Sequence, residues 1–143
     1  MDGEHSNPIQ VLLVDDHSAF RRSVALFVRS ESDMQLVAEA ANGREAVEKF
    51  REHRPDVTLM DLQMGTMNGI DAVTSIRAEF PDARIILLTT YPGDDRAIRA
   101  FRAGARGYVL KGSLHKELLD TIRAVHAGER RIPPELAGSL DVS

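Results

Sequence analysis

Cysteine is absent from this 143-residue sequence, so it can form neither a disulfide framework nor a thiolate metal site. Long hydrophobic runs are also absent. Stretches such as Ile85 to Leu88 are far shorter than the about 20 apolar residues that span a bilayer, and we expect no membrane partner. An excess of positive charge is missing too. The formal net charge of −4 argues against direct DNA binding by this segment, because attraction to phosphates dominates nucleic-acid affinity.

The first eight residues lack the apolar core of a secretory signal. Met1 to Pro8 are mostly polar, and we expect a disordered leader at residues 1–8 and a cytoplasmic location for the chain. The rest of the sequence can form one domain with its own core, since 43% of all residues are hydrophobic and 28% are charged.

Short apolar segments rich in β-branched residues alternate with segments of helical spacing. The apolar segments do not alternate strictly with polar residues, which is typical of strands covered on both sheet faces. We expect strands at Ile9–Val14, Met34–Ala40, Asp56–Met60, Arg84–Leu88 and Gly107–Leu110. Helical spacing appears between Ser18 and Ser30, after Gly43, after Gly69, from about Asp94 to Ala103, and from Leu114 to Val125.

These segments form five successive βα units. Short links between alternating strands and helices favour an α/β fold, with a doubly wound parallel sheet and helices on both faces. In such sheets the working site lies outside the carboxyl ends of the strands. The residues that follow each strand are therefore the first place to look for chemistry.

Polar side chains follow four of the five predicted strands. Asp15 and Asp16 follow the first strand, Asp61 the third, Thr89 the fourth and Lys111 the fifth. At about 4 Å and an effective dielectric constant near 20, each pair of carboxylates would repel by about 4 kcal/mol, so either protons or a cation must lie among them. Mg²⁺ suits such a site, because it prefers oxygen ligands and keeps positions for water and phosphate oxygens.

Each of these residues also has a plainer interpretation. Asp15 or Asp16 would serve as a helix cap, Asp61 as an ordinary loop carboxylate, and Lys111 as a solvated surface lysine. For any one residue taken alone, both interpretations stay open. Five such groups at successive strand ends favour a shared site when they are taken together.

Two stretches around these residues resemble response-regulator receiver domains. Asp61-Leu-Gln-Met-Gly-Thr-Met-Asn-Gly69 is similar to the family's D-x-x-M-P-x-x-x-G loop, and Gly104-Ala-Arg-Gly-Tyr-Val-Leu-Lys111 is similar to its G-A-x-G-Y-[LV]-x-K segment. The resemblance covers about residues 9–127, which would form the receiver domain. The helix after Lys111 is similar to that of receivers joined to a LuxR-type helix-turn-helix. The implied fold is flavodoxin-like, with strand order 2-1-3-4-5.

This resemblance implies a phosphorylation switch in two-component signalling. Such a domain is not an enzyme in the usual sense, although it promotes its own phosphotransfer and dephosphorylation. Asp61 would accept a phosphoryl group from a sensor histidine kinase, and Lys111 and Thr89 would contact that group. The implied Mg²⁺ ligands are Asp15, Asp16, Asp61 and the backbone carbonyl of Gln63.

The resemblance further implies how the signal leaves the site. Thr89 and Tyr108 would act as the switch, and phosphorylation would bias the helix near residues 94–103. Gln63 and Tyr91 would tune the lifetime of the phosphoryl group.

Residues 128–143 would form a linker, with a short helix from about Pro134, toward an output domain beyond Ser143. DNA would be bound only through that output domain, and phosphorylated copies would be able to form a homodimer.

The sequence departs from the family pattern at two positions. Gly65 stands where the phosphoacceptor loop usually has proline, which should loosen that loop. Gly112 stands where the family often has a proline after a cis bond. We expect a trans bond between Lys111 and Gly112, since a cis bond before a non-proline residue costs about 3 kcal/mol. Neither change removes a chemical group from the site.

Other interpretations fit less well. A haloacid-dehalogenase-like phosphatase would have Asp-x-Asp where Asp15-Asp16-His17 stands, and the two acidic residues would repel the phosphate of a flavodoxin-type FMN. A degenerate receiver that only binds proteins is less consistent with the complete set of five groups. A stand-alone receiver that docks a protein partner is the alternative to one with a DNA-binding domain. Arg96, Arg99 and Arg102 would be either its docking surface or a solvated basic face.

Overall fold

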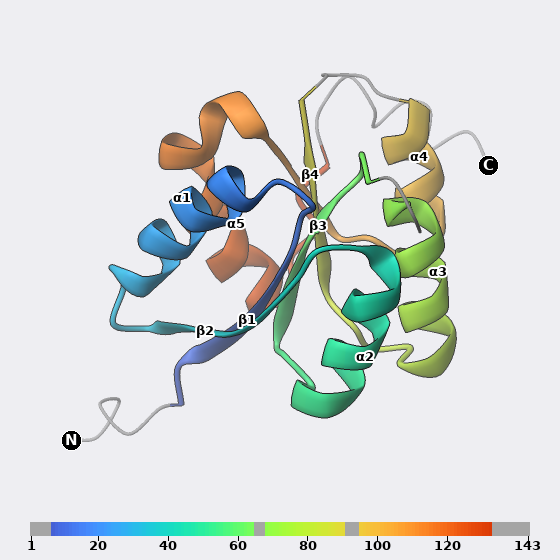
Figure 1. Cartoon of the computed structure of the whole chain (residues 1–143), viewed down its shortest axis with the longest axis horizontal. Helices are drawn as coiled ribbons and strands as arrows, with labels where there is room; N and C mark the ends of the chain where they lie inside the picture. Colours follow the sequence, from blue (N-terminus) through green and yellow to red (C-terminus); the bar gives the residue numbers. More distant parts are fainter. Residues whose placement is uncertain (1–6, 65–67, 91–94, 133–143) are drawn as a thin grey trace.

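The computed structural model describes residues 7–64, 68–90 and 95–132. They form a five-stranded parallel sheet with the order β2-β1-β3-β4-β5 (Figure 1). This is the flavodoxin-like order that the family resemblance implied. The strands are β1 (Ile9–Val14), β2 (Met34–Ala40), β3 (Val57–Asp61), β4 (Ile85–Thr89) and β5 (Gly107–Leu110).

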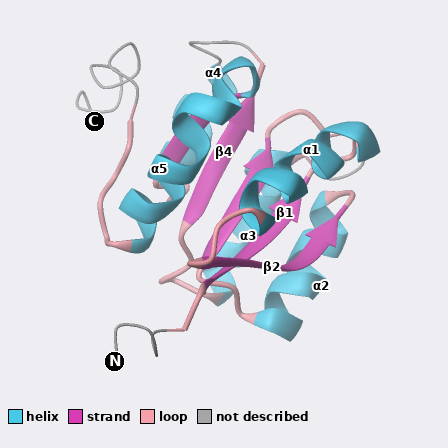
Figure 2. Cartoon of the chain, turned by 90° about the vertical axis from the view of Figure 1, so that its left-hand side faces the viewer, coloured by secondary structure: helices cyan, strands magenta, loops and turns pink. Residues whose placement is uncertain are grey.

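Helices cover both faces of the sheet. One face carries α1 and α5, and the other carries α2, α3 and α4 (Figures 1 and 2). The helices are α1 (Ser18–Arg29), α2 (Gly43–His53), α3 (Gly69–Glu79), α4 (Asp95–Arg102) and α5 (Leu114–His126), with a 3₁₀ turn at Lys111–Ser113 before α5. The doubly wound α/β fold predicted from the sequence is therefore confirmed. Among the described residues, no helix has the length and apolar character needed to cross a bilayer.

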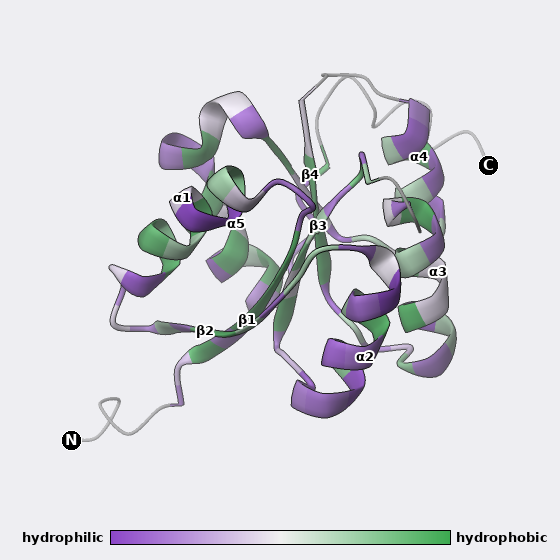
Figure 3. Cartoon of the chain, viewed as in Figure 1, coloured by the Kyte–Doolittle hydropathy of each residue, from purple (hydrophilic) through white to green (hydrophobic). Residues whose placement is uncertain are grey.

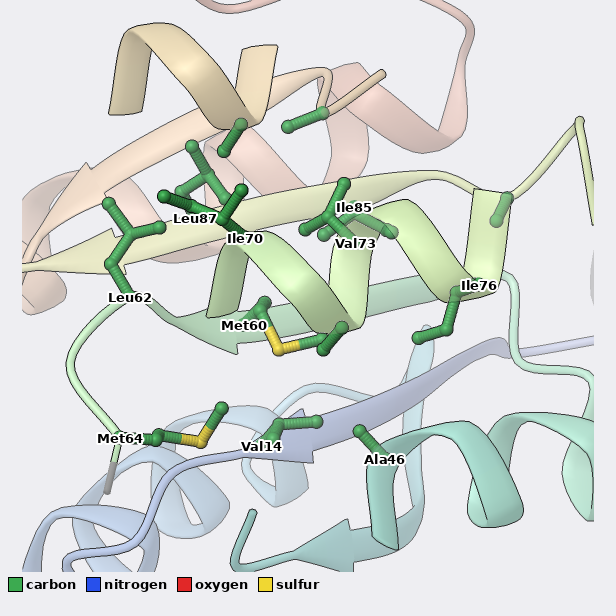
Figure 4. Packing of buried hydrophobic residues seen from close by; sticks show 14 of the residues in the cluster. Val14, Ala46, Met60, Leu62, Met64, Ile70, Val73, Ile76, Ile85 and Leu87 are labelled. Carbon is green, nitrogen blue, oxygen red and sulfur yellow. The ribbon is translucent and has the colours of Figure 1, made fainter. Parts of the chain in front are cut away.

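Two apolar clusters lie between the sheet and its helices. In α3, the residues Ile70, Val73 and Ile76 belong to one buried cluster with Met60 and Leu87 of the central strands (Figure 4). On the opposite face, α1 and α5 bury their own stripes against Val11, Leu13 and neighbouring strand residues. Polar residues lie on the outer faces of the helices, while the strands are largely apolar (Figure 3). This distribution explains why the strand sequences do not alternate.

Two strands are shifted by one residue from the prediction at both of their ends. The third strand was expected at Asp56–Met60 and the fourth at Arg84–Leu88, but β3 ends at Asp61 and β4 ends at Thr89. Asp56 lies before β3, where its carboxylate accepts a hydrogen bond from the Gln10 N–H at 2.8 Å. At the other end, the ladder continues to Asp61, which lies opposite Leu88. Asp61 and Thr89 thus belong to the sheet rather than to mobile loops.

The described chain continues past α5 along the body of the domain. Gly128 has a φ of +98°, which turns the chain away from the helix end. The Arg131 N–H then donates to the Arg106 carbonyl at 2.8 Å, and Ile132 packs against the cluster beneath α4. The predicted helix near Pro134, most of the predicted leader and the Gly65 position lie outside the described residues. No described peptide bond is cis, so the Lys111–Gly112 bond is trans, as expected.

Gly69 sits where α3 begins beside the end of β3. A Cβ atom at this position would lie 2.4 Å from the Asp61 carbonyl oxygen and 2.9 Å from the Leu62 Cα. Both are backbone atoms, which cannot move away as a flexible side chain can. The absence of a side chain here lets α3 start directly against the strand end that carries Asp61.

Gly69→Ala should lower the free energy of unfolding by about 1–3 kcal/mol, because the added methyl forces the backbone apart. Gly112→Ala is the matched control, since a Cβ at Gly112 meets nothing within 4 Å and should change stability by less than about 0.5 kcal/mol. Urea denaturation followed by circular dichroism measures both. Equal stability of the two variants would contradict the close approach at Gly69.

Candidate functional site

The strand register brings the predicted site residues to one edge of the sheet. Val14 lies opposite Met60, so the residues that follow, Asp15 and Asp61, lie side by side. Thr89 lies opposite Leu110 in the next pair of strands, and Lys111 comes directly after Leu110. The carboxyl ends of these strands meet at the upper part of Figure 1. The convergence predicted from the order of strands and helices is therefore observed.

Lys111 lies between the two buried carboxylates. Its Nζ is 2.9 Å from Asp15 Oδ2 and 3.4 Å from Asp61 Oδ1. Both carboxylates are fully buried, and the lysine side chain is 15% exposed. The ammonium group also lies 4.4 Å from the centre of the Phe20 ring on α1, a cation–π distance. Lys111 is thus held from three sides and is not a solvated surface lysine.

Asp61 has one oxygen that is satisfied and one that is not. Its Oδ1 accepts a hydrogen bond from the Gln63 N–H at 3.0 Å, whereas its buried Oδ2 has no hydrogen-bond partner in the part of the chain that the structure describes. Burial raises the pKa of this carboxyl to about 6, and the Asp15 carboxylate adds to the rise, while Gln63 and Lys111 oppose it. A buried carboxylate oxygen with an open valence is the arrangement expected of a nucleophile or a metal ligand.

Asp16 and His17 complete an acidic cluster with Asp15 and Asp61. One potential ligand atom from each of these four residues lies within 4.8 Å of all the others. Asp16 and His17 are exposed, whereas Asp15 and Asp61 are buried, so solvent reaches the cluster beside Asp16 and His17. Within residues 7–64, 68–90 and 95–132, this is the one place where three or more potential metal ligands lie close together.

These residues fit a hard divalent cation. Three carboxylates supply oxygen atoms, and the buried Asp61 Oδ2 has no hydrogen-bond partner among the described residues. Lys111 compensates only part of the negative charge. The main chain of Gln63 runs against the site through its hydrogen bond to Asp61, which brings the predicted carbonyl ligand into the same region.

Sequence reasoning overlooked Arg21. This side chain of α1 donates a hydrogen bond to the Asp15 carbonyl oxygen and lies 3.3 Å from Glu39 Oε1 at the end of β2. It therefore ties the Asp15–Asp16 turn to the neighbouring strand. The sequence gives no clear signal for this contact, because it joins residues six positions apart across the turn between β1 and α1.

The two predicted switch residues lie inside the domain. Thr89 is fully buried at the end of β4, and Tyr108 of β5 is 7% exposed. The Tyr108 ring stacks against Phe101 of α4, with 6.5 Å between ring centres. β5 and α4 are thus joined by an aromatic contact. Tyr91, predicted to tune the phosphoryl lifetime, lies outside the described residues.

Asp61→Asn should raise the melting temperature of the metal-free protein at pH 7.5 by about 3 °C or more. The folded-state pKa of Asp61 lies above its ordinary value of 3.8, so ionisation costs the folded state stability progressively from about pH 4 to pH 6. Asparagine removes this cost and keeps an acceptor for the Gln63 N–H. The gain should therefore shrink as the pH is lowered from 7.5 toward 4.5.

Differential scanning fluorimetry in EDTA measures this effect across pH. Asp120→Asn removes an exposed carboxylate on α5 and serves as the control, with little change expected at any pH. If Asp61→Asn melted at a lower temperature than the parent at pH 7.5, attraction to Lys111 would outweigh the cost of burial.

Comparison with known proteins identifies the family. A sequence model of the response regulator receiver domain matches residues 11–123. The response regulator protein VraR of Staphylococcus aureus is 38% identical over 128 residues, which cover 90% of this chain and 61% of VraR. The chain thus spans about three fifths of the length of such relatives.

Solved structures agree with this result. A LuxR-family two-component response regulator from Aurantimonas has a TM-score of 0.86 and 37% identity, with 94% of this chain and 96% of that chain covered. The receiver domain of a NarL-type regulator from Mycobacterium tuberculosis has a TM-score of 0.82 and 27% identity, with 87% of this chain and 100% of that chain covered. With a family match over most of the described fold, this chain belongs to the receiver domains of two-component response regulators.

Proposed function

We propose that this receiver domain is switched by phosphorylation of Asp61, with a sensor histidine kinase as the phosphoryl donor. The observation that carries the proposal is the buried Asp61 Oδ2, which lacks a hydrogen-bond partner beside a second carboxylate and an ammonium group. A nucleophile needs a free lone pair, and Asp61 Oδ2 offers one at the carboxyl ends of the strands, where the predicted site residues gather.

In the proposed reaction, an oxygen of Asp61 attacks phosphorus and forms an aspartyl phosphate. The bond between phosphorus and the donor nitrogen of phosphohistidine breaks, and its electron pair returns to the imidazole. With acetyl phosphate as the donor, a P–O bond breaks and acetate leaves. Phosphoryl transfer depends more on positioning and on charge neutralisation than on covalent help from the protein.

The surrounding residues would neutralise the charge of the incoming group. Asp16 would hold Mg²⁺ directly, Asp15 partly through water, and Asp61 and the Gln63 carbonyl would complete the protein ligands. The bound ion supplies positive charge next to the phosphoryl oxygens. Lys111 already lies 3.4 Å from Asp61 Oδ1, so its ammonium group can pair with a phosphoryl oxygen without a large movement.

The switch would begin at Thr89. Its hydroxyl would donate a hydrogen bond to the phosphoryl group and draw the end of β4 toward Asp61. Leu87 of β4 lies opposite Tyr108 of β5, so a shift of β4 acts on the strand that carries Tyr108. The contact between Tyr108 and Phe101 would pass that shift to α4.

The lifetime of the phosphoryl group would depend on Gln63 and Tyr91, which flank the proposed path of the hydrolytic water. The Gln63 side chain is half-buried, and its Oε1 lies 3.5 Å from the Thr90 hydroxyl. Such a contact could hold Gln63 beside the site.

We further propose that the phosphorylated receiver controls a DNA-binding domain of the LuxR type, with homodimer formation as one route. The relatives that support this proposal are longer than the present chain, and one solved relative is a LuxR-family regulator. The formal charge of −4 favours DNA contact through a separate domain. Reading the coding sequence downstream of Ser143 tests the proposal: a helix-turn-helix supports it, and an immediate stop codon favours a stand-alone receiver.

Incubation with acetyl phosphate and Mg²⁺ should add about 80 Da to the intact mass, equal to one phosphoryl group. Asp61→Asn should abolish the gain, because the amide is not a nucleophile of this kind. EDTA should abolish it in the parent. Asp56→Asn is the control, because Asp56 lies before β3, at the opposite end of the strand from Asp61. This variant should keep the mass gain. Modification that persists in Asp61→Asn would contradict the assignment.

Thr89→Val should uncouple phosphorylation from Tyr108. The variant loses the hydroxyl that would bind the phosphoryl group, so phosphorylation should be slower, and the phosphorylated variant should show no change at Tyr108. The sequence has only two tyrosines, so NMR of their ring protons can resolve the response. An identical ring shift in the phosphorylated parent and the phosphorylated variant would refute the role of Thr89.

A further inference from the structure

His17 is the one nitrogen ligand in the acidic cluster. Its Nδ1 lies 3.0 Å from Asp16 Oδ1 and 3.2 Å from Asp15 Oδ1. Its side chain is 66% exposed, yet it turns toward the two carboxylates rather than into solvent. None of the roles proposed above uses this side chain.

These distances match those between neighbouring ligands of one metal ion. In octahedral coordination with metal–ligand bonds of about 2.1 Å, adjacent ligand atoms lie about 3 Å apart and opposite ones about 4.2 Å apart. The two contacts of His17 correspond to the shorter separation, and the 4.8 Å span of all four groups requires only a small contraction. The imidazole is therefore within reach of any ion held by Asp15, Asp16 and Asp61.

The backbone fixes this orientation. The His17 N–H donates to Asp15 Oδ1 at 2.7 Å, so the turn between β1 and α1 folds His17 back over the Asp15 carboxylate. The His17 carbonyl accepts from the Arg21 N–H at 3.0 Å, which anchors the same residue to the first turn of α1. The buried Asp61 Oδ2, without a hydrogen-bond partner, is the second observation that points to an ion at this place.

We propose that His17 is a fourth protein ligand of this centre, and that it lets the centre take a borderline transition-metal ion such as Zn²⁺ in competition with Mg²⁺. The inference rests on the proposed binding of a divalent ion by the cluster. Imidazole is a common ligand of Zn²⁺, Ni²⁺ and Cu²⁺, whereas Mg²⁺ prefers oxygen. A nitrogen donor among three carboxylates therefore favours the transition metal more than it favours Mg²⁺.

The test is the ratio of Zn²⁺ to Mg²⁺ affinity of the full 143-residue chain, measured by isothermal titration calorimetry without any phosphoryl donor. His17→Ala should lower this ratio about tenfold or more, since even the loss of a group that only supports a metal ligand costs about 10–100-fold. His53→Ala is the matched control, because His53 is the last residue of α2 and lies near the start of β3, far from the carboxyl ends of the strands. This substitution should leave the ratio within about twofold.

Two further measurements locate the ion. Long-range ¹⁵N–¹H NMR can resolve the five histidines, and Zn²⁺ should shift the Nδ1 signal that His17→Ala removes. Asp61→Asn should weaken Zn²⁺ binding as well, which places Zn²⁺ in the same centre. Melting curves in EDTA show whether each variant is folded.

An unchanged Zn²⁺ to Mg²⁺ ratio in His17→Ala, or no shift of the His17 Nδ1 signal, would overturn the inference. Equal weakening of both ions would also overturn it, because His17 would then act only by orienting the carboxylates. Failure of the proposed function appears elsewhere: the parent would gain no mass from acetyl phosphate and Mg²⁺, whatever the result with Zn²⁺.

Discussion

Two buried carboxylates, those of Asp15 and Asp61, lie side by side at the carboxyl edge of the sheet with the Lys111 ammonium group between them. Burial makes their repulsion costly, because the interior screens charge far less than water does. A single lysine cannot balance both of them and the nearby Asp16. The sheet must therefore hold these groups together against their repulsion, and the rest of the fold can be understood as the framework that does so.

The strand order explains how the framework works. β1 and β3 are neighbours in the middle of the sheet, and each is paired on both sides, so Asp15 and Asp61 lie at the ends of well-supported strands. Asp15 is held further by the Asp15 N–H bond to the Ala40 carbonyl of β2 and by Arg21 at its own carbonyl. Gly69 allows α3 to begin directly against the end of β3. Side chains that repel one another are thus carried by the central strands of the sheet.

Much of this could be predicted from the sequence, because apolar runs and helical stripes reflect burial directly. The five βα units led to Asp15, Asp61, Thr89 and Lys111 without any coordinates. The one-residue shifts of β3 and β4 could not be predicted, since ladder pairing between Asp61 and Leu88 depends on a partner strand distant in sequence. The same limit applies to Arg21 and His17, whose roles depend on side-chain direction around a turn rather than on residue type.

The repulsion that makes the site costly also makes it responsive. A single ion pair between Lys111 and one carboxylate would already be balanced in charge. A phosphoryl group added to such a pair would bring excess negative charge. Here Asp61 Oδ2 is left without a hydrogen bond, and burial holds the pKa of Asp61 near 6. A cation bound here would offset this negative charge, and its binding would therefore stabilise the folded state. Because Thr89 and Tyr108 belong to strands paired with each other, the relief at Asp61 can reach α4 through packed atoms.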